Sequence, residues 1–292
     1  MSRPFRFAVN MLTPGTGAEW RAKCREAEAL GYDVILVPDH LGMPAPFPSL
    51  VAAAEVTERP RVGTFVLNAG FWNPSLLARE VASTDQLTGG RLELGLGAGY
   101  VKAEHDSAGL PFGSPRERVD HLERTVTELE RLLGDPGHVP AAAQSPRPPL
   151  LLGGNGDRML RLAARHADVA AFTGGASDRD GTLRLISPTA LEERVALYRS
   201  FEDGRAEPAE LNCLVQIVAV GGDPRARIRE LMGYTEDLGE DEFLDHPALL
   251  TGSVKEIAER VRGHRERYGF TYFTVLEPFM EEFAPVIEEL RG

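Results

Sequence analysis

Short runs of apolar residues alternate along the chain with longer stretches in which apolar residues recur at helical spacing. The first run covers residues 5–9, and the helical pattern after it, residues 19–30, stops at Gly31. Seven further strand-like runs lie at residues 34–37, 62–67, 92–96, 150–152, 169–172, 214–220 and 272–276. The helical stretches that follow them lie at residues 49–57, 74–87, 115–133, 159–164, 191–201, 257–268 and 283–290. Eight strands alternating with helices predict an α/β fold, a single closed (β/α)8 barrel of the TIM type.

Two stretches interrupt this alternation. Residues 138–149 are rich in Pro and Ala, and residues 221–251 have an acidic middle with little periodicity. A domain boundary at either stretch would leave a fragment whose strands have no partners. We therefore interpret both as insertions in one barrel domain that covers residues 1–292.

Composition narrows the class of protein. The 292 residues carry 32 Lys and Arg against 44 Asp and Glu, a formal net charge of -12, so nucleic acid is not an expected partner. No segment reaches the roughly 20 apolar residues of a membrane span, and the first residues show no signal-peptide run. A cytoplasmic protein without membrane contact is expected. The cysteines, Cys24 and Cys213, are expected to be buried packing residues.

Candidate chemistry lies at the end of the second strand. The apolar run at residues 34–37 leads through a proline into Asp39 and His40. In a parallel barrel, the carboxyl ends of the strands form the functional face. A histidine, whose ordinary pKa is about 6.5, can exchange a proton there near neutral pH. No metal site is expected, because neighbours such as Asp39-His40 and His105-Asp106 would point to opposite faces of a strand.

Two glycine-rich segments also follow strands. In residues 95–99 the glycines alternate, which does not fit the spacing of a dinucleotide loop, and no helix is predicted before Pro115. Such glycines either let a flat ligand approach the backbone or relieve crowding at the barrel rim. Residues 150–157 form a strand, a glycine loop and a helix start, which favours a phosphate site. A tight turn with Asp157 as the helix cap is the alternative.

Several ordered motifs resemble a known family. They are Pro38-Asp39-His40-Leu41, residues 63–67 with Asn73-Pro74, residues 87–99 and residues 148–154. Together they resemble the luciferase-like monooxygenase superfamily and, within it, the branch that uses the deazaflavin coenzyme F420. The resemblance implies a bacterial luciferase-like barrel and an F420-dependent oxidoreductase that transfers a hydride at the deazaflavin C5 carbon.

The resemblance also implies the cofactor contacts. The deazaflavin ring would lie across the barrel mouth beside Asp39. It would rest against a strand bulge at Phe65-Val66 that contains a non-prolyl cis peptide bond, with Asn68 at the ring edge. The other implied contacts are backbone amides of Ala98 and Gly99, a phosphate site at Gly153, Gly154, Gly156 and Asp157, and Thr173 in the same pocket.

Catalytic roles follow from the same resemblance. His40 matches the position that transfers a proton in a sugar-phosphate dehydrogenase of this branch; a purely structural hydrogen bond is the alternative. Tyr100 stands where that dehydrogenase has a catalytic glutamate, and Ala176 lies near an expected substrate-phosphate lysine. Sugar-phosphate oxidation is therefore not expected, and Tyr100 is a second candidate for handling the proton. A mostly apolar pocket, or else part of the core, would be formed by Phe47, Phe71, Trp72 and Phe112.

Three functions stay open at this level. The first is an F420-dependent oxidoreductase that acts on a small, mostly apolar organic substrate. The second is a monooxygenase that uses flavin mononucleotide (FMN) on the same scaffold. The third is a deazaflavin-binding protein without turnover, in which Tyr100 marks a lost active site. Members of this superfamily often form dimers, so a homodimer is compatible with the resemblance.

Overall fold

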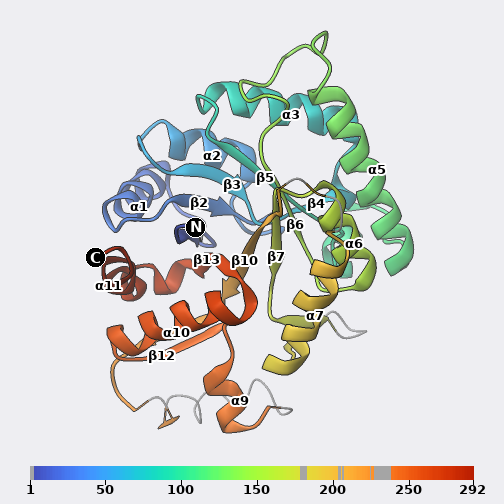
Figure 1. Ribbon diagram of the computed structural model, residues 1–292. Coiled ribbons are helices and arrows are strands. Elements are labelled where there is room, and N and C mark those ends of the chain that lie inside the picture. Colours follow the sequence, from blue (N-terminus) through green and yellow to red (C-terminus); the bar gives the residue numbers. More distant parts are fainter. Residues whose placement is uncertain (1–2, 178–182, 203–204, 206, 224, 227–237) are drawn as a thin grey trace.

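Parallel strands close into one barrel (Figure 1). The computed structural model describes residues 3–177, 183–202, 205, 207–223, 225–226 and 238–292. The barrel segments are β1 (Arg6–Asn10), β2 (Val34–Val37), β3 (Arg61–Thr64), β4 (Leu67–Asn68), β5 (Leu92–Gly97), β6 (Leu150–Gly153), β7 (Val169–Phe172), β10 (Glu210–Val215) and β13 (Phe270–Leu276). Strand β1 pairs with both β2 and β13, and β3 pairs with β5, which closes the ring. Because β3 and β4 are two parts of one strand, the predicted (β/α)8 barrel is confirmed.

Helices between the strands cover the outside of the barrel (Figure 1). The longer ones are α1 (Gly17–Ala29), α2 (Pro46–Ala54), α3 (Pro74–Leu87), α5 (Pro115–Leu133), α6 (Asp157–His166), α7 (Pro188–Ser200), α10 (Val254–Tyr268) and α11 (Met280–Arg291). Local sequence explains where they begin. Asn73 and Ser114 accept hydrogen bonds from the first turns of α3 and α5, and a proline follows each cap. No helix among the described residues is long and apolar enough to cross a membrane.

Strand alternation divides the buried side chains between two cores. On β1, Phe7 and Val9 belong to the core between the strands and the helices. Ala8, between them in sequence, belongs to a second cluster inside the barrel, with Leu36 and Tyr272. This is the expected result of neighbouring residues pointing to opposite faces of a strand.

Charged side chains fill the barrel interior at the amino ends of the strands. Arg6 on β1 forms ion pairs with Glu93 of β5 and Glu210 of β10. Its guanidinium carbon lies 4.4 Å from the centre of the Tyr272 ring. Arg61 of β3 also contacts Glu93, at 2.7 Å. Since each buried carboxylate has a cationic partner, these charges are compatible with burial.

The third barrel strand carries one extra residue relative to β5. Gly63 pairs with Glu93, and Leu67 pairs with Leu96, so four steps on this strand match three on β5. Within the interval, the peptide bond between Phe65 and Val66 is cis, as predicted. Phe65 and Val66 both pack in the cluster inside the barrel, and Leu67 returns to the core beneath the helices. The extra residue therefore lets two consecutive side chains face the barrel interior, and the normal alternation resumes at Leu67.

One predicted strand was wrong. The run at residues 214–220 is divided, because β10 ends at Val215 and β11 (Ile217–Val220) pairs instead with β12 (Leu249–Gly252). Helix α9 (Glu240–Asp245) and most of β12 lie in residues 221–251, the stretch with little periodicity that the sequence indicates as an insertion. A continuous apolar run shows burial but does not show where a strand changes partners.

Some short elements were not predicted. Helix α4 (Lys102–Ala108) begins shortly after β5, although no helix was expected before Pro115. A hairpin of β8 (Gly175–Ser177) and β9 (Leu183–Leu185) follows β7, and two short 3-10 helices, η1 (Ala69–Phe71) and η3 (Glu277–Phe279), follow β4 and β13. Short polar elements lack the periodicity on which the prediction relied.

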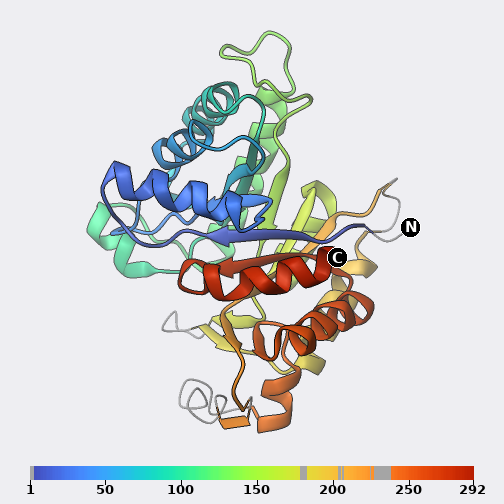
Figure 2. The same ribbon diagram turned by 90° about the vertical axis from the view of Figure 1, so that its left-hand side faces the viewer.

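The first and last parts of the chain lie side by side, as the blue and red segments of Figure 2 show. Tyr32, after α1, donates its hydroxyl hydrogen to the carbonyl oxygen of Met280 at 2.8 Å. Arg291, at the end of α11, donates to Asp33 at 2.7 Å. These contacts fasten the first βα unit to the last one where β1 and β13 close the barrel.

Candidate active site

Asp39 is a half-buried residue at the mouth of the barrel, where it connects two strand ends. It follows β2, and its Oδ2 accepts hydrogen bonds from the backbone N–H of Asn68 and from Nε1–H of Trp72, both at 3.2 Å. Burial raises the pKa of Asp39, although these two donors oppose the shift. The carboxylate thus ties the end of β2 to the end of β4. Its predicted contact with a cofactor stays a prediction.

His40 has a carboxylate partner that the sequence did not reveal. Its Nδ1 lies 2.8 Å from Oε1 of Glu104, in the first turn of α4. The His40 and Glu104 side chains are 29% and 15% exposed. Nε2 of His40 makes no hydrogen bond with the described part of the chain. An ionised Glu104 accepts a hydrogen bond from Nδ1–H, which leaves Nε2 available to a substrate.

Tyr100 lies beside this pair. Its ring is perpendicular to the His40 ring, with 5.9 Å between the ring centres, and the residue is 45% exposed. Partial burial raises the pKa of Tyr100, and the negative charge of Glu104 adds to the shift. At neutral pH the hydroxyl is therefore protonated and can donate a hydrogen bond. Position 100 has no carboxylate, but Glu104, four residues later in the first turn of α4, places one beside Tyr100 and His40.

Two glycines of β5 make room for the neighbouring bulged strand, which contains Thr64 and Val66. A Cβ atom on Gly95 would lie 2.0 Å from the carbonyl oxygen of Thr64, and one on Gly97 would lie 2.8 Å from Cγ2 of Val66. These two positions are glycine because any side chain there would collide with the bulged strand. Thr64 and Val66 thus occupy the side of Gly95 and Gly97 that faces the bulged strand, and the approach of a flat ligand to the segment stays a prediction.

Asn68 and Gly99 meet at the same edge of the mouth. A Cβ atom on Gly99, whose φ is +74°, would lie 2.3 Å from Oδ1 of Asn68. That oxygen accepts the backbone N–H of Gly70 at 3.0 Å, and Nδ2 of Asn68 contacts Nε2 of the buried His105 at 3.0 Å. Ala98 is half-buried beside Gly99. The predicted ring-edge residues therefore do lie together, whereas His105 was not predicted.

The glycine loop after β6 leads directly into α6. Gly156 is the N-cap of this helix, and it provides no side-chain hydrogen bond. The first helical hydrogen bond runs from Leu160 to Gly156, so the amides of residues 157–159 come before it. The amide of Gly154 is already used, since it donates to the carbonyl oxygen of Ala171 at 3.3 Å. A Cβ atom on Gly153, at the end of β6, would lie 3.6 Å from Cγ1 of Val66.

Asp157 does not cap α6. It is the first residue of the helix, and its Oδ1 lies 2.6 Å from Nη1 of Arg194 on α7. The interpretation of Asp157 as the cap was therefore wrong, because the chain is extended at Gly156 and becomes helical at Asp157. Arg158 next to it is paired with Asp120 at 2.6 Å. Arg158 on α6 and Arg194 on α7 thus both lie beside the start of α6, and neither was predicted.

Thr173 links the ends of neighbouring strands. Its hydroxyl oxygen accepts a hydrogen bond from Nδ2 of Asn155 at 3.1 Å, and its carbonyl oxygen accepts one from Nε2 of Gln216 at 3.0 Å. Asn155 also donates to the carbonyl oxygen of Gly175. Thr173 therefore follows β7 and helps to fasten the glycine loop to the start of β8, which contains Ala176, and its place in the cofactor pocket stays a prediction.

Two of the aromatic residues expected in the pocket pack against each other, and the other two pack against His105. Phe47 is buried, and its ring lies 5.4 Å from that of Trp72. Phe71 and Phe112 lie on His105, with 4.9 and 5.0 Å between ring centres. These contacts make the four rings part of the packing around the site.

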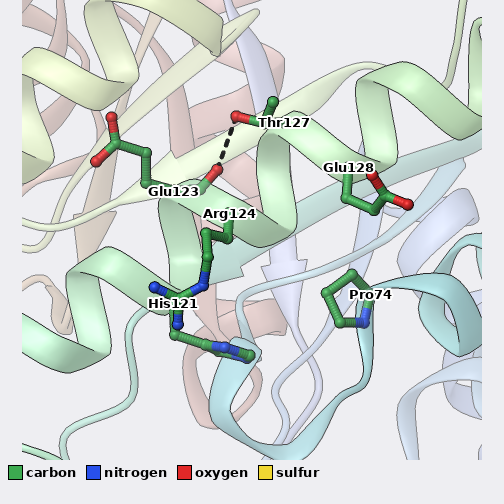
Figure 3. Close-up of a pocket in the computed structure, with 6 residues that line it drawn as sticks. All are labelled: Pro74, His121, Glu123, Arg124, Thr127 and Glu128. Carbon is green, nitrogen blue, oxygen red and sulfur yellow. Dashed lines mark hydrogen bonds between the residues drawn. The ribbon is translucent and has the colours of Figure 1, made fainter.

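Figure 3 shows a cavity of about 500 Å³ on a different part of the surface. It lies between the start of α3 and the side of α5, and it is lined by Pro74, His121, Glu123, Arg124, Thr127 and Glu128. It contains none of the predicted site residues. Among the described residues, no group of three or more His, Cys, Asp or Glu side chains could hold a metal ion.

Comparison with known proteins identifies the family. The family model described as luciferase-like monooxygenase matches residues 1–232. The chain belongs to the luciferase-like monooxygenase family. This luciferase-like chain is 32% identical over 318 residues to an F420-dependent glucose-6-phosphate dehydrogenase of Intrasporangium calvum, with 91% of this chain and 92% of the relative covered. A relative of the same name from Beutenbergia cavernae is 27% identical over 311 residues, which cover 82% and 92% of the two chains.

Solved structures agree with the luciferase-like barrel. An F420-dependent secondary alcohol dehydrogenase in complex with an F420-acetone adduct superposes with a TM-score of 0.76 at 16% identity, covering 99% of this chain and all of that one. Long-chain alkane monooxygenase gives a TM-score of 0.77 at 14% identity, covering 100% and 92%. These likenesses support the fold. The curated relatives confirm the predicted F420-dependent branch and make this luciferase-like protein an oxidoreductase.

Proposed function

We propose that the protein transfers a hydride between coenzyme F420 and a small, mostly apolar alcohol or carbonyl compound, with His40 as the proton-transfer residue. The pairing of His40 with Glu104 at the barrel mouth carries this proposal. A histidine with one nitrogen held by a carboxylate and the other free of the described chain is suited to move a proton. Deazaflavin, when bound, would supply the hydride acceptor or donor at its C5 carbon.

His40 balances the charge that hydride transfer creates. When an alcohol loses a hydride from its carbon, its O–H proton passes to Nε2 of His40, and a carbonyl compound results. In the reverse direction, Nε2 of a protonated His40 returns the proton to the carbonyl oxygen as the hydride arrives at the carbon. Glu104 accepts a hydrogen bond from Nδ1–H in both directions and stabilises the cationic ring. Tyr100 can donate a second hydrogen bond to the same oxygen.

The residues around the mouth fit the cofactor. The amides at the start of α6 have no side-chain cap, and a helix N-terminus favours a phosphate. Arg158 and Arg194 also lie there, paired with Asp120 and Asp157 respectively. Asn68 would contact the ring from the opposite edge, with the amides of Ala98 and Gly99. The F420-dependent names of the curated relatives support the same assignment.

The surface beside His40 favours an apolar substrate. Leu41 is 51% exposed and Met43 37% exposed, and Tyr100 presents a third large apolar surface to solvent. Exposed apolar groups gathered beside a catalytic residue favour a ligand with apolar surface. Sugar-phosphate substrates are disfavoured, since Ala176 stands near the position expected for a phosphate-binding lysine.

A titration with the two cofactors tests the cofactor assignment. We expect F420 fluorescence to be quenched at micromolar protein, and FMN to bind at least tenfold more weakly. Tighter binding of FMN would overturn the assignment and favour the monooxygenase. F420 binding without turnover of any alcohol or carbonyl compound in a broad panel would favour the binding protein without activity.

Substitution of the pair tests the chemistry. Glu104→Gln keeps the shape and removes the charge. A charge-assisted hydrogen bond contributes roughly 1.5–3 kcal/mol, and partial exposure reduces this to about 1–2 kcal/mol. We therefore expect kcat to fall about 5- to 30-fold with little change in the Kd for F420. Glu128→Gln, which alters a surface pair with Arg131 on α5, is the matched control. An unchanged kcat in Glu104→Gln, or in His40→Ala, would contradict the proposed role.

A further inference from the structure

His105 is a buried histidine that the proposed chemistry does not use. It lies on α4, is 1% exposed, and is flanked by the rings of Phe71 and Phe112. Both of its ring nitrogens have partners. Nδ1 lies 3.0 Å from the carbonyl oxygen of Pro111, and Nε2 lies 3.0 Å from Nδ2 of Asn68. A buried histidine with two specific polar contacts has a fixed orientation.

The hydrogen bonds around His105 can run in one direction only. The Pro111 carbonyl can only accept, so Nδ1 of His105 carries a hydrogen. At the other end, the backbone N–H of Gly70 can only donate, so the atom of Asn68 that faces it is the oxygen Oδ1, at 3.0 Å. Nδ2 of Asn68 therefore faces Nε2 of His105 and donates to it. This assignment makes His105 neutral, with its hydrogen on Nδ1.

The same network fixes what Asn68 can offer to a ligand. One hydrogen of Nδ2 is given to His105, and Oδ1 accepts from Gly70. The second hydrogen of Nδ2 has no partner in the described part of the chain. Side chains at the two neighbouring glycines would disturb this arrangement, because a Cβ on Gly70 would lie 2.6 Å from Cε1 of His105, and a Cβ on Gly99 would meet Asn68.

We propose that His105 is a positioning residue that holds the Asn68 carboxamide as a hydrogen-bond donor toward an acceptor atom at the edge of the bound cofactor ring. The inference rests on the proposed function, because Asn68 is the expected ring-edge contact. Deazaflavin and flavin rings both carry carbonyl oxygens on their pyrimidine end, and these match a single N–H donor. Without the acceptor nitrogen of His105, the Gly70 hydrogen bond alone would hold the carboxamide, and the direction of Nδ2 would be less well fixed.

Two substitutions at position 105 separate the two ring nitrogens. His105→Gln can place an amide oxygen near the position of Nε2 and still accept from Asn68. His105→Asn is too short to reach Asn68 and can replace only the donor to Pro111. We expect the Kd for F420, measured by fluorescence quenching, to rise about tenfold in His105→Asn and less than about threefold in His105→Gln. Unfolding temperatures measured on both variants show whether a general loss of structure is responsible.

A double-mutant cycle tests whether His105 acts through Asn68. In Asn68→Ala, the further change His105→Asn should leave the Kd for F420 unaltered, because the group to be positioned is gone. An equal effect of His105→Asn in both backgrounds would overturn the inference. Equal loss of affinity in His105→Gln and His105→Asn would overturn it as well, since packing alone would then explain the effect.

A measurement on the unsubstituted protein covers the case in which the variants fail to fold. Nitrogen-15 NMR distinguishes protonated from unprotonated ring nitrogens of histidine. We expect His105 to carry its hydrogen on Nδ1 alone, with and without F420. A hydrogen on Nε2 would overturn the inference. Failure of the unsubstituted protein to bind F420 in the titration would instead overturn the proposed function, so the two failures are distinguishable.

Discussion

Replacing Gly156 by aspartate should strengthen the fold and weaken cofactor binding at the same time. Gly156 is the N-cap of α6 with φ −72° and ψ 147°, and no atom lies within 4 Å of the position of an added Cβ. An aspartate there can accept hydrogen bonds from the amides of the first turn, which stabilises the helix by about 0.2–1 kcal/mol relative to glycine. The same carboxylate would occupy the place proposed for the cofactor phosphate.

The loss of affinity can be worked from charge. Two unit charges about 5 Å apart repel by about 0.8 kcal/mol in water and about 3 kcal/mol at the effective dielectric constant of a protein surface. We therefore expect the Kd for F420 to rise about 4- to 150-fold in Gly156→Asp. Gly156→Asn provides the same cap without charge, and Gly156→Ala provides neither.

The assay pairs fluorescence titration of F420 with chemical denaturation of the same samples. The expected order of affinity is unsubstituted protein and Gly156→Ala, then Gly156→Asn, then Gly156→Asp, while unfolding free energy should be highest in the two capped variants. Because stability and affinity should move in opposite directions, a damaged fold cannot imitate this result. Equal affinities of Gly156→Asp and Gly156→Asn would refute the placement of a phosphate at α6.

Two further predictions concern stability. Burial disfavours ionised Glu277, but its contacts with Lys23 and the N–H groups of residues 12 and 13 lower its pKa overall. A lowered pKa contributes stability above the unfolded value of about 4.3 that is lost as pH falls through the folded value. Glu277→Gln should therefore cost about 1–2 kcal/mol at pH 7 in denaturant unfolding, and the difference should shrink below about pH 4; a pH-independent difference would contradict this origin. Gly95→Ala should destabilise by about 1–3 kcal/mol or more, because its Cβ meets the Thr64 carbonyl oxygen, whereas Gly263→Ala, on α10 with open space around it, should stabilise by about 0.5–1 kcal/mol. Thermal unfolding of the two glycine variants decides this, and a Gly95→Ala protein as stable as Gly263→Ala would refute the crowding argument.

The barrel could be predicted because each of its strands is marked locally. Apolar runs, terminating glycines and capping residues followed by proline are local sequence signals. They can be recognised without knowledge of the fold. The end of β10 was not marked in this way. Gln216 separates two apolar segments whose partners, β13 and β12, lie far along the chain, so the break depends on tertiary pairing.

The candidate site was predictable only in part for the same reason. His40 lies at a strand end and could be found from that position alone. Glu104 and His105 lie on a short, mostly polar helix, so neither shows the periodicity that marks an element. Their importance comes from partners 64 and 37 residues away, His40 and Asn68. Such partnerships leave no trace in local spacing.

The extra residue between Gly63 and Leu67 limits how this gene can change in length. Deleting one residue there would restore simple pairing with β5 and keep Leu67 opposite Leu96, but it would remove one of the two consecutive side chains, Phe65 or Val66, that fill the barrel interior. Such a deletion would also leave gaps beside Gly95 and Gly97, where Thr64 and Val66 now fill the space that glycine provides. Libraries that vary this protein should therefore keep the spacing of residues 63–68 fixed while its side chains are exchanged.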